Sequence, residues 1–342
     1  MTLPLAVDQP PMEAELVRSL PVGDEWIYEP KWDGFRCLVF KDGADVDLRS
    51  KSGKPLARYF PDLVATIAQI GTKRLVLDGE IVIPKDGALV FDELLRRIHP
   101  AESRVRKLAE ANPAHLITFD LLVNSRGTDM TSRAFRTRRD GLQKLYSSRL
   151  EAISSIHLSP STDDVAMARR WLAGEHGGLD GVMAKRVDLP YLGGERTGMK
   201  KIKRMKTAEC VVGGFRWSKA GGTVGSLLLG LYDEEGDLHH VGFCSALNAG
   251  VRAEADDRLL PLRGGDGFSG RAPSGQSRWR TEGSGEWEPL NPETVAEVEY
   301  DHFAGGRFRH GTRFLRWRPD KDPGMCRMAQ VEKEGSSAVG LL

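Results

Sequence analysis

The sequence changes its pattern near residue 205, and this change constrains the fold more than any other feature. Before it, strand-like runs alternate with segments whose apolar residues recur at helical spacing, as in 56–70 and 91–98. After the lysine-rich stretch KKIKRMK, most apolar runs are short, strand-like and bounded by glycine-rich turns. At 342 residues, the chain is too long for one ordinary core. We therefore predict two domains, residues 1–205 and 206–330, followed by a flexible tail over 331–342.

The second domain is predicted as a small β-barrel, because many short strands with glycine turns and few helices are typical of that architecture. At this size the barrel fits an OB-fold. Glycine-rich and polar residues dominate 263–285, which we expect to form a mobile loop. In the first domain, residues 26–40 are predicted as one strand, joined to a second over 45–49 by an Asp-Gly turn. Further strands are expected at RLVLDGEIVIP, HLITFDLLV and LDGVMAKR.

Composition and charge narrow the class of protein. Hydrophobic residues make up 40% and charged residues 28% of the chain, as in ordinary soluble proteins. The formal net charge is +1, so a face for nucleic acid would need local clustering of basic residues. The N-terminus does not resemble a signal peptide, and no apolar run approaches a membrane span. The four cysteines lie too far apart for a zinc site, and we expect buried thiols in a reducing cytosol.

The stretch YEPKWDGFR raises the possibility that Lys31 is a nucleophile. A free lysine, with a pKa near ~10.4, is almost entirely ammonium at neutral pH. Nearby cations or desolvation lower the pKa and make the amine reactive. The segment RTGMKKIKRMK supplies such cations, and Lys201 and Lys203 would share one face of a strand and could contact one phosphate together. A solvated basic surface or a stripe along a DNA backbone is the alternative.

Two Asp-Gly elements offer carboxylates. LDGE places Asp78 and Glu80 on one face of a strand, and LDGVMAK places Asp180 at a strand start with Lys185 close behind. Separated carboxylates can hold a hard divalent cation against phosphate oxygens, although each element alone is equally typical of a turn. Phe119 in TFDLL is either a core residue or a platform on which a purine stacks.

Two further basic clusters have open interpretations. Four cations surround Asp320 near the C-terminus and form either a polyphosphate clamp or an exposed basic strand: Arg313, Arg316, Arg318 and Lys321. A second set in SRAFRTRR either contacts DNA or forms a solvated helix face: Arg133, Arg136, Arg138 and Arg139.

The order of these motifs resembles the covalent nucleotidyltransferase superfamily and, within it, the ATP-dependent DNA ligases. The motifs run Lys-x-Asp-Gly, Asp-Gly-Glu, Phe-Asp-Leu, Asp-Gly-Val-x-Ala-Lys, Lys-x-Lys and Arg-x-Asp-Lys, from about Pro11 to Pro323. The likeness is to small standalone bacterial ligases related to the ligase domain of the end-joining ligase. It implies an α+β fold, with an adenylation (nucleotidyltransferase) domain of antiparallel sheets flanked by helices, followed by an OB-fold.

The resemblance implies that Lys31 attacks the α-phosphate of ATP and keeps AMP as a phosphoramide. AMP then passes to the 5′-phosphate at a nick, and the 3′-hydroxyl displaces it to seal the strand. ATP, with Mg²⁺ or Mn²⁺, is the implied cofactor, and nicked double-stranded DNA is the implied partner. The second domain is implied to move between steps, with the linker near residue 205 as its hinge.

The resemblance also implies a role for each matching residue. Lys51 stands where the family has arginine, and Asp180 where many relatives have glutamate. The implied roles are the adenine edge for Glu29, ribose or phosphate for Arg36, phosphate or DNA for Lys51, ribose or metal for Glu80, base stacking for Phe119, metal for Asp180, the α-phosphate for Lys185, Lys201 and Lys203, and the pyrophosphate clamp for Arg318 and Lys321.

Two other readings share these motifs. An RNA ligase or an mRNA-capping guanylyltransferase would carry the same lysine, but WIYEPKWDGFR, FDLL and RFLRWRPDKDP together favour a DNA ligase. A non-catalytic nick-binding protein is the other alternative. We expect a monomer in the bacterial cytoplasm, associated with the nucleoid and acting in DNA repair. A repair polymerase or an end-binding protein is a possible partner.

Overall fold

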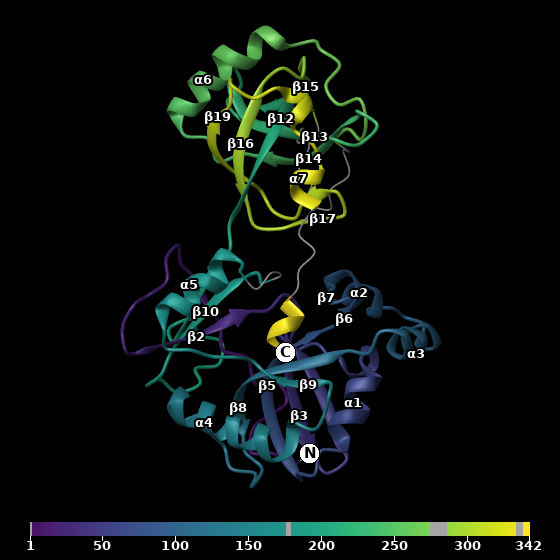
Figure 1. Ribbon diagram of the computed structural model, residues 1–342, viewed down its shortest axis with the longest axis vertical. Coiled ribbons are helices and arrows are strands. Elements are labelled where there is room, and N and C mark those ends of the chain that lie inside the picture. Colours follow the sequence, from purple (N-terminus) through teal and green to yellow (C-terminus); the bar gives the residue numbers. More distant parts are fainter. Residues whose placement is uncertain (1, 176–178, 274–285, 333–337) are drawn as a thin grey trace. The chain divides into compact units, whose positions relative to one another are not determined.

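The computed structural model describes residues 2–175, 179–273, 286–332 and 338–342. The chain divides into two compact units (Figure 1). The first extends to Arg204 and includes residues 338–342, and the second begins at Met205. Within the described residues, no helix is long and apolar enough to cross a membrane.

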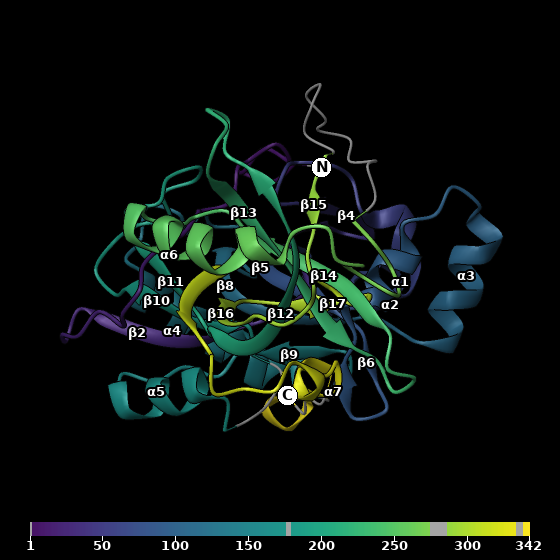
Figure 2. The same cartoon turned by 90° about the horizontal axis from the view of Figure 1, so that it is seen from above.

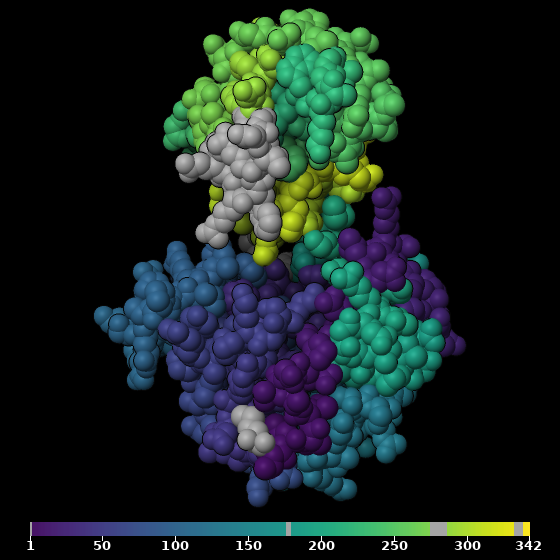
Figure 3. All heavy atoms as spheres, turned by 180° about the vertical axis from the view of Figure 1, so that it is seen from behind, coloured from purple at the N-terminus to yellow at the C-terminus, as the bar shows by residue number. Residues whose placement is uncertain are grey.

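Two sheets form the first unit. One has the order β4-β3-β5-β8-β9, with β3 at Phe35–Asp42, β4 at Asp45–Ser50, β5 at Arg74–Val82, β8 at His115–Val123 and β9 at Ile156–Leu158. The other has the order β1-β11-β10-β2, with β1 at Glu15–Leu16, β2 at Trp26–Lys31, β10 at Gly181–Arg186 and β11 at Met199–Lys203. The inner pairs are antiparallel, as predicted, whereas the edge pairs β8–β9 and β1–β11 are parallel. The space-filling view in Figure 3 shows the N-terminal segment (purple) beside teal residues of the β10–β11 region.

The predicted single strand over residues 26–40 is wrong, because the chain leaves one sheet and enters the other at Trp32–Gly34. Strand β2 pairs with β10, whereas β3 pairs with β4 and β5. Gly34 permits this crossing, since a Cβ atom there would lie 2.3 Å from the carbonyl oxygen of Ile81. Lys31 is therefore the last residue of a strand, at a junction between two sheets.

Helices cover one face of the five-stranded sheet. They are α1 at Pro61–Ala68, α2 at Phe91–Arg97 and α4 at Phe135–Leu145, whereas α3 at Glu102–Ala111 packs against α1 and α2. Leu63 of α1 and Leu142 of α4 join Cys37 and Leu77 of the sheet in one buried core. Strand β8 is buried along almost its whole length, as expected for a strand covered on both faces. Helix α3 was not predicted; it lies at the edge of the unit in Figures 1 and 2 and buries only Val105 and Ala109.

Helix α5, at Val165–Ala173, packs against the four-stranded sheet. Asp164 caps its first turn by accepting a hydrogen bond from the N–H of Ala166 at 2.7 Å, and Gly174 ends it in the left-handed conformation. Trp171 of α5 lies in a buried cluster with Val182 and Ile202. The minor elements of this unit are η1 at Ala57–Tyr59, β6 at Pro84–Lys85, β7 at Ala88–Leu89 and the π-helical turn η2 at Tyr146–Leu150.

The second unit is a curled antiparallel sheet, consistent with the predicted OB-fold. Its order is β14-β13-β12-β16-β19, with β12 at Lys206–Trp217, β13 at Val224–Tyr232, β14 at Leu238–Cys244, β16 at Val295–Tyr300 and β19 at Arg313–Trp317. The short strand β15, at Glu288–Pro289, also pairs with β12, and β17 at Phe303–Ala304 pairs with β18 at Arg307–Phe308. The N–H of Thr312 donates a hydrogen bond to the carbonyl of Phe243 at 3.1 Å, which ties the segment before β19 to β14.

One helix of the second unit was missed. Helix α6, at Ala249–Leu259, buries only Ala255 and Leu259, so its apolar spacing is too sparse to be recognised in the sequence. Asn248 caps it by accepting a hydrogen bond from Val251 N–H at 2.9 Å. The remaining elements are η3 at Leu260–Leu262, η4 at Pro323–Met325, α7 at Ala329–Glu332 and η5 at Ala338–Leu341.

Two predictions of mobile segments require correction. Residues 274–285 of the predicted loop lie outside the described residues, but Phe268 before them is buried in the core beside Trp287. Residues 333–337 of the predicted tail also lie outside them, but Ala338 is fully buried in the first unit because it packs with Trp26 and its apolar neighbours. All four cysteines are free and buried, as expected.

Candidate active site

A pocket in the first unit is lined by residues from both sheets, and it gathers most of the predicted site residues. Those in its lining are Glu29, Lys31, Arg36, Lys51, Glu80, Phe119, Lys185 and Lys201. Asp180 is not in the lining but contacts Lys31 directly. Arg318 and Lys321 belong to the second unit.

Lys31 forms an ion pair and a hydrogen bond with Asp180. The register of β10 creates this contact, since Gly181 lies opposite Lys31 and the N–H of Asp180 donates to the Lys31 carbonyl at 3.0 Å. Gly181 has φ +146°, and a Cβ atom there would lie 1.9 Å from the carbonyl oxygen of Ile202. Only glycine lets the chain pass so close to β11 and bring Asp180 to the lysine.

The electrostatics around Lys31 differ from the expectation. Burial lowers the pKa of Lys31, but the carboxylates of Asp180, Glu80 and Asp33 outweigh it and leave that pKa raised. The predicted effect of neighbouring cations falls on Lys201 instead, whose pKa is lowered by burial and then by Lys51, Lys31 and other cations. The side chain of Lys31 is therefore an ammonium held by acids.

Glu80 is the titratable acid of the pocket. Burial raises its pKa to about 7, against the opposing effects of Arg36 and Lys31. Within the described residues, no group of three or more His, Cys, Asp or Glu side chains could hold a metal alone. Mg²⁺ is commonly bound by one or two carboxylates together with substrate phosphates. Glu80 and Asp180, both acting on Lys31, fit that mode, with the remaining ligands supplied by a nucleotide and water.

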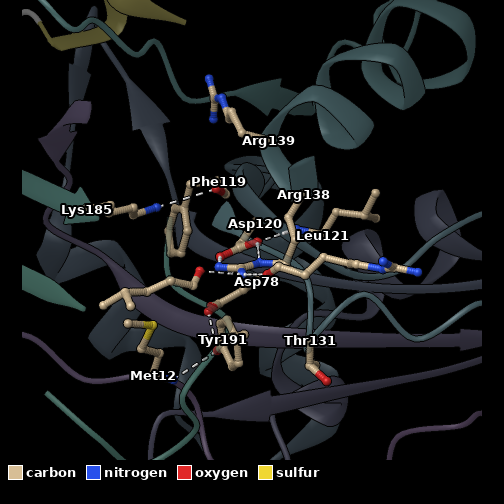
Figure 4. Close-up of polar contacts among 12 residues, drawn as sticks. Met12, Asp78, Phe119, Asp120, Leu121, Thr131, Arg138, Arg139, Lys185 and Tyr191 are labelled. Carbon is tan, nitrogen blue, oxygen red and sulfur yellow. Dashed lines mark hydrogen bonds and ion pairs between the residues drawn. The ribbon is translucent and has the colours of Figure 1, made fainter. Parts of the chain in front are cut away.

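Lys185 lies against the ring of Phe119, the predicted platform for a purine (Figure 4). Its Nζ lies 2.8 Å from Oε2 of Glu29 and 4.5 Å from the ring centroid of Phe119. Burial lowers the pKa of Lys185, partly opposed by Glu29 and Asp120. Phe119 is itself 8% exposed, so its ring is fixed by these contacts and presents a small area to the pocket.

Arg36 is fixed by partners that the sequence did not identify. The Nε and one terminal nitrogen of Arg36 each donate to the fully buried carboxylate of Asp78 at 2.6 Å. The Tyr191 hydroxyl donates to the same carboxylate at 2.6 Å (Figure 4). The guanidinium lies 4.9 Å from the Phe119 ring centroid. Burial opposes the charge on Arg36, but Asp78 outweighs it and raises the pKa of the guanidinium. Asp78 was considered a metal ligand, whereas it holds an arginine.

Both readings of the SRAFRTRR cluster fail for two of its arginines. Arg138 is 1% exposed and forms a bidentate pair with Asp120 at 2.8 and 2.9 Å. Arg139 is 6% exposed and approaches Oε1 of Glu29 at 3.4 Å. The helix turns these two side chains inward, where they support the pocket instead of meeting DNA or bulk water. Arg133 and Arg136 are exposed.

Lys51 also contacts an acid, and the other two predicted cations, Lys201 and Lys203, lie on β11. Lys51 lies 3.5 Å from Glu13, a pocket residue that the sequence did not single out and that also binds Arg196 at 3.0 Å. Lys203 follows Lys201 by two residues on β11, so the two side chains share a face of that strand.

The two predicted clamp residues form a cluster with acids of the second unit. Arg318 binds Asp320 through two hydrogen bonds at 2.9 and 2.8 Å and also contacts Glu209. Lys321 lies 2.7 Å from Glu209. The motif around Arg318 and Lys321 does not predict Glu209, because Glu209 lies at the start of the unit, far from them in sequence.

Comparisons with known proteins find similar proteins over most of the chain. The family model for the ATP dependent DNA ligase domain matches residues 11–203, and that for the ATP dependent DNA ligase C terminal region matches residues 220–321. DNA ligase C1 of Mycolicibacterium smegmatis is 43% identical over 97% of this chain and 96% of its own length. The multifunctional non-homologous end joining DNA repair protein LigD of Mycobacterium tuberculosis is 30% identical over 87% of this chain and 37% of its own length. Among solved structures, a Lig E DNA ligase is similar with a TM-score of 0.52 and 16% identity, covering 90% of this chain and 99% of that one.

Proposed function

The chain belongs to the ATP-dependent DNA ligase family, and on that basis we propose that it seals nicks through an adenylate carried on Lys31. A DNA ligase acts on nicked DNA and uses ATP with a divalent metal. The position of Lys31 carries the proposal for this residue. It ends β2 within a pocket that combines carboxylates, a fixed aromatic ring and several cations.

In the first step, the ammonium of Lys31 releases its proton to solvent, and the free amine attacks the α-phosphorus of ATP. The N–P bond forms as the bond to the β-phosphate oxygen breaks, and pyrophosphate leaves. Lys201 and Lys203 approach the α-phosphate and neutralise its charge, which is the main task of a protein in phosphoryl transfer. Burial, and then repulsion by Lys51 and Lys31, lowers the pKa of Lys201, and an arriving anion would relieve that repulsion.

A divalent cation held by Glu80, Asp180 and phosphate oxygens would supply positive charge that offsets these carboxylates and stabilises the transferring phosphoryl group. The chain's own residues set the rest of the geometry. Asp180 keeps Lys31 aligned as its ion-pair partner until the nucleotide arrives. Glu80 exchanges a proton near neutral pH and so links cation binding to pH.

Phe119 stacks on the adenine, and Glu29 meets the base edge. Glu29 is suited to this because Lys185 and Arg139 hold its buried carboxylate from two sides. Arg36, fixed by Asp78, reaches the ribose or a phosphate from beside Phe119. Arg318 and Lys321 would orient the departing pyrophosphate after release from Glu209.

The later steps transfer AMP to the 5′-phosphate at a nick, and the 3′-hydroxyl then attacks that phosphate and releases AMP. We place this activity in DNA repair in the bacterial cytoplasm, because the relative LigD carries DNA repair in its name. A pull-down that recovers only replication-fork proteins would contradict the repair assignment.

The test of the nucleophile is labelling with α-³²P ATP and Mg²⁺. We expect an alkali-resistant labelled adduct on the intact protein and none on Lys31→Ala, and a labelled Lys31→Ala protein would overturn the assignment. Sealing of nicked DNA should exceed sealing of nicked RNA, and ATP should be preferred to GTP. A preference for GTP would favour a guanylyltransferase, and nick binding without sealing would favour a non-catalytic protein.

A further inference from the structure

A basic cluster in the second unit has no role in the site described above. It consists of Arg216 on β12, His240 on β14, Arg271 in the segment after η3, and Arg307 on β18. The three arginines are half-buried. Arg271 ties the cluster together, since its guanidinium donates to the carbonyl of His240 at 3.3 Å and to the carbonyl of Gly306, next to Arg307. Residues from four separate segments thus converge in one place.

The cluster lacks the acids that accompany other arginines of this unit. Arg313 binds Glu299 at 2.8 Å and Arg316 binds Glu297 at 2.6 Å. Within the described part of the chain, none of the cluster's three arginines forms an ion pair with a carboxylate, and the Nε atoms of Arg216 and Arg271 are buried without a hydrogen-bond partner. Burial lowers the pKa of Arg216, and burial and then Arg307 lower the pKa of Arg271. Positive charge is therefore concentrated here without a neutralising carboxylate among the described residues.

The surroundings of His240 indicate what kind of ligand the cluster would bind. It is 8% exposed, and neither ring nitrogen has a hydrogen-bond partner among the described residues. Burial, followed by Arg307, Arg216 and Arg271, lowers its pKa to about 4, so the ring is neutral at physiological pH. A neutral imidazole offers one N–H donor, and three neighbouring guanidinium groups offer more. Buried donors of this kind are normally paired, and an oxyanion would pair all of them at once.

We propose that Arg216, His240, Arg271 and Arg307 form a binding site for one phosphate group of the DNA backbone. The inference rests on the proposed function, which makes nicked duplex the polyanion that this chain must hold. Guanidinium groups match phosphate oxygens in geometry as well as charge. A phosphate of the DNA backbone that binds the cluster would release its own counterions. Its negative charge would also favour the protonated form of His240.

The first test measures binding of a nicked duplex with a dideoxy 3′ end, which cannot be sealed, over a range of salt concentrations. Losing one phosphate contact should weaken binding on the order of tenfold at low salt and flatten the log–log salt slope by about one. We expect this for Arg307→Gln. Arg263→Gln removes an arginine that already pairs with Glu288 in the same unit, and it should leave the slope unchanged. An unchanged slope for Arg307→Gln, with a thermal unfolding midpoint equal to that of the control, would overturn the site.

The second test follows the ¹⁵N imidazole resonances of His240 in the full chain by NMR. Addition of the blocked duplex should raise the pKa of His240 from about 4, and Arg307→Gln should remove that response. A response to inorganic phosphate or pyrophosphate that the duplex neither reproduces nor competes with would assign the site to a free anion and overturn the DNA assignment. If the intact protein fails to seal nicks but still shows both effects, the ligase proposal fails while the phosphate site stands.

Discussion

Two clusters of positive charge, one in each unit, differ in whether acids accompany them. In the pocket of the first unit, three central cations each have an acid: Lys31 has Asp180, Arg36 has Asp78, and Lys185 has Glu29. In the second unit, Arg216, Arg271 and Arg307 have no ion-pair partner among the described residues. Paired cations are fixed in position and must exchange partners when a substrate binds. Unpaired cations need no exchange, so they suit a ligand that is bound and released without chemistry.

The largest expected effect comes from breaking a pair in the pocket. Asp78→Asn would leave the buried guanidinium of Arg36 without its counter-charge and Tyr191 without a charged acceptor. Removal of one partner of a buried pair costs about 3–5 kcal/mol. We expect a loss of that size in the free energy of unfolding, measured with urea. A loss below about 1 kcal/mol would show that the pocket does not depend on its pairing.

Asp180→Asn tests whether an acid assists or only restrains the lysine. We expect adenylylation to slow by about 10–100-fold, because a proposed cation ligand is lost. The measurement is the single-turnover rate of adduct formation against Mg²⁺ concentration. Asp188→Asn alters an exposed pair just beyond the other end of β10 and should leave the rate unchanged. A faster Asp180→Asn enzyme would mean that Asp180 only withholds the nucleophile.

The pH dependence of cation binding tests whether Glu80 is the carboxylate that holds the cation. Its pKa of about 7 leaves it mostly protonated at pH 6 and mostly ionised at pH 8. Since a cation needs the carboxylate, the affinity for Mn²⁺ should rise about tenfold from pH 6 to pH 8. Electron paramagnetic resonance of free Mn²⁺ in the presence of ATP would measure this. Glu80→Gln should bind weakly at both pH values, and a persisting tenfold rise in that variant would exclude Glu80 as its source.

The raised pKa of Glu80 also predicts a stability change without metal. The folded protein retains the proton in the range from the ordinary carboxyl pKa to about 7, whereas the unfolded chain releases it. The unfolded state therefore binds fewer protons in this window, and stability should fall as pH rises through it. Urea unfolding at pH 5 and pH 7 would show the difference, and Glu80→Gln should reduce it.

The smallest effect is expected at an exposed pair. Glu102 and Arg106 lie one turn apart on α3, and the Glu102 side chain is 71% exposed. Glu102→Gln should cost only about 0.3–0.5 kcal/mol, since water and salt screen the pair. Urea unfolding of this variant is the control for Asp78→Asn. A cost comparable to that of Asp78→Asn would show that burial does not distinguish the two pairs.

The sequence predicts residues that act in short motifs better than it predicts their partners. The pocket gathers Lys31, Glu80, Phe119 and Lys201, since each motif lies on or beside a strand of the two sheets. The Asp78–Tyr191 hydrogen bond joins residues 113 positions apart, and no local sequence pattern predicts it. The sign of the pKa shift at Lys31 was also missed, because it depends on how close Asp180 comes.

The same distinction holds for the fold. Strand β8 and helix α2 follow from their apolar patterns and were predicted. Helices α3 and α6 bury too few residues to show a pattern. The break at Trp32–Gly34 was missed because the residues on both sides are β-forming, and only the close approach of Gly34 to β5 requires the change of sheet.

This crossing places Lys31 where the positions of the two sheets depend on each other. The lysine is anchored in one sheet by pairing with β10, and only Trp32 and Asp33 separate it from Gly34, which is seated against the other sheet. A link of two residues leaves little freedom for the sheets to move independently. A shear of one sheet over the other would therefore displace Lys31 relative to Phe119 on β8.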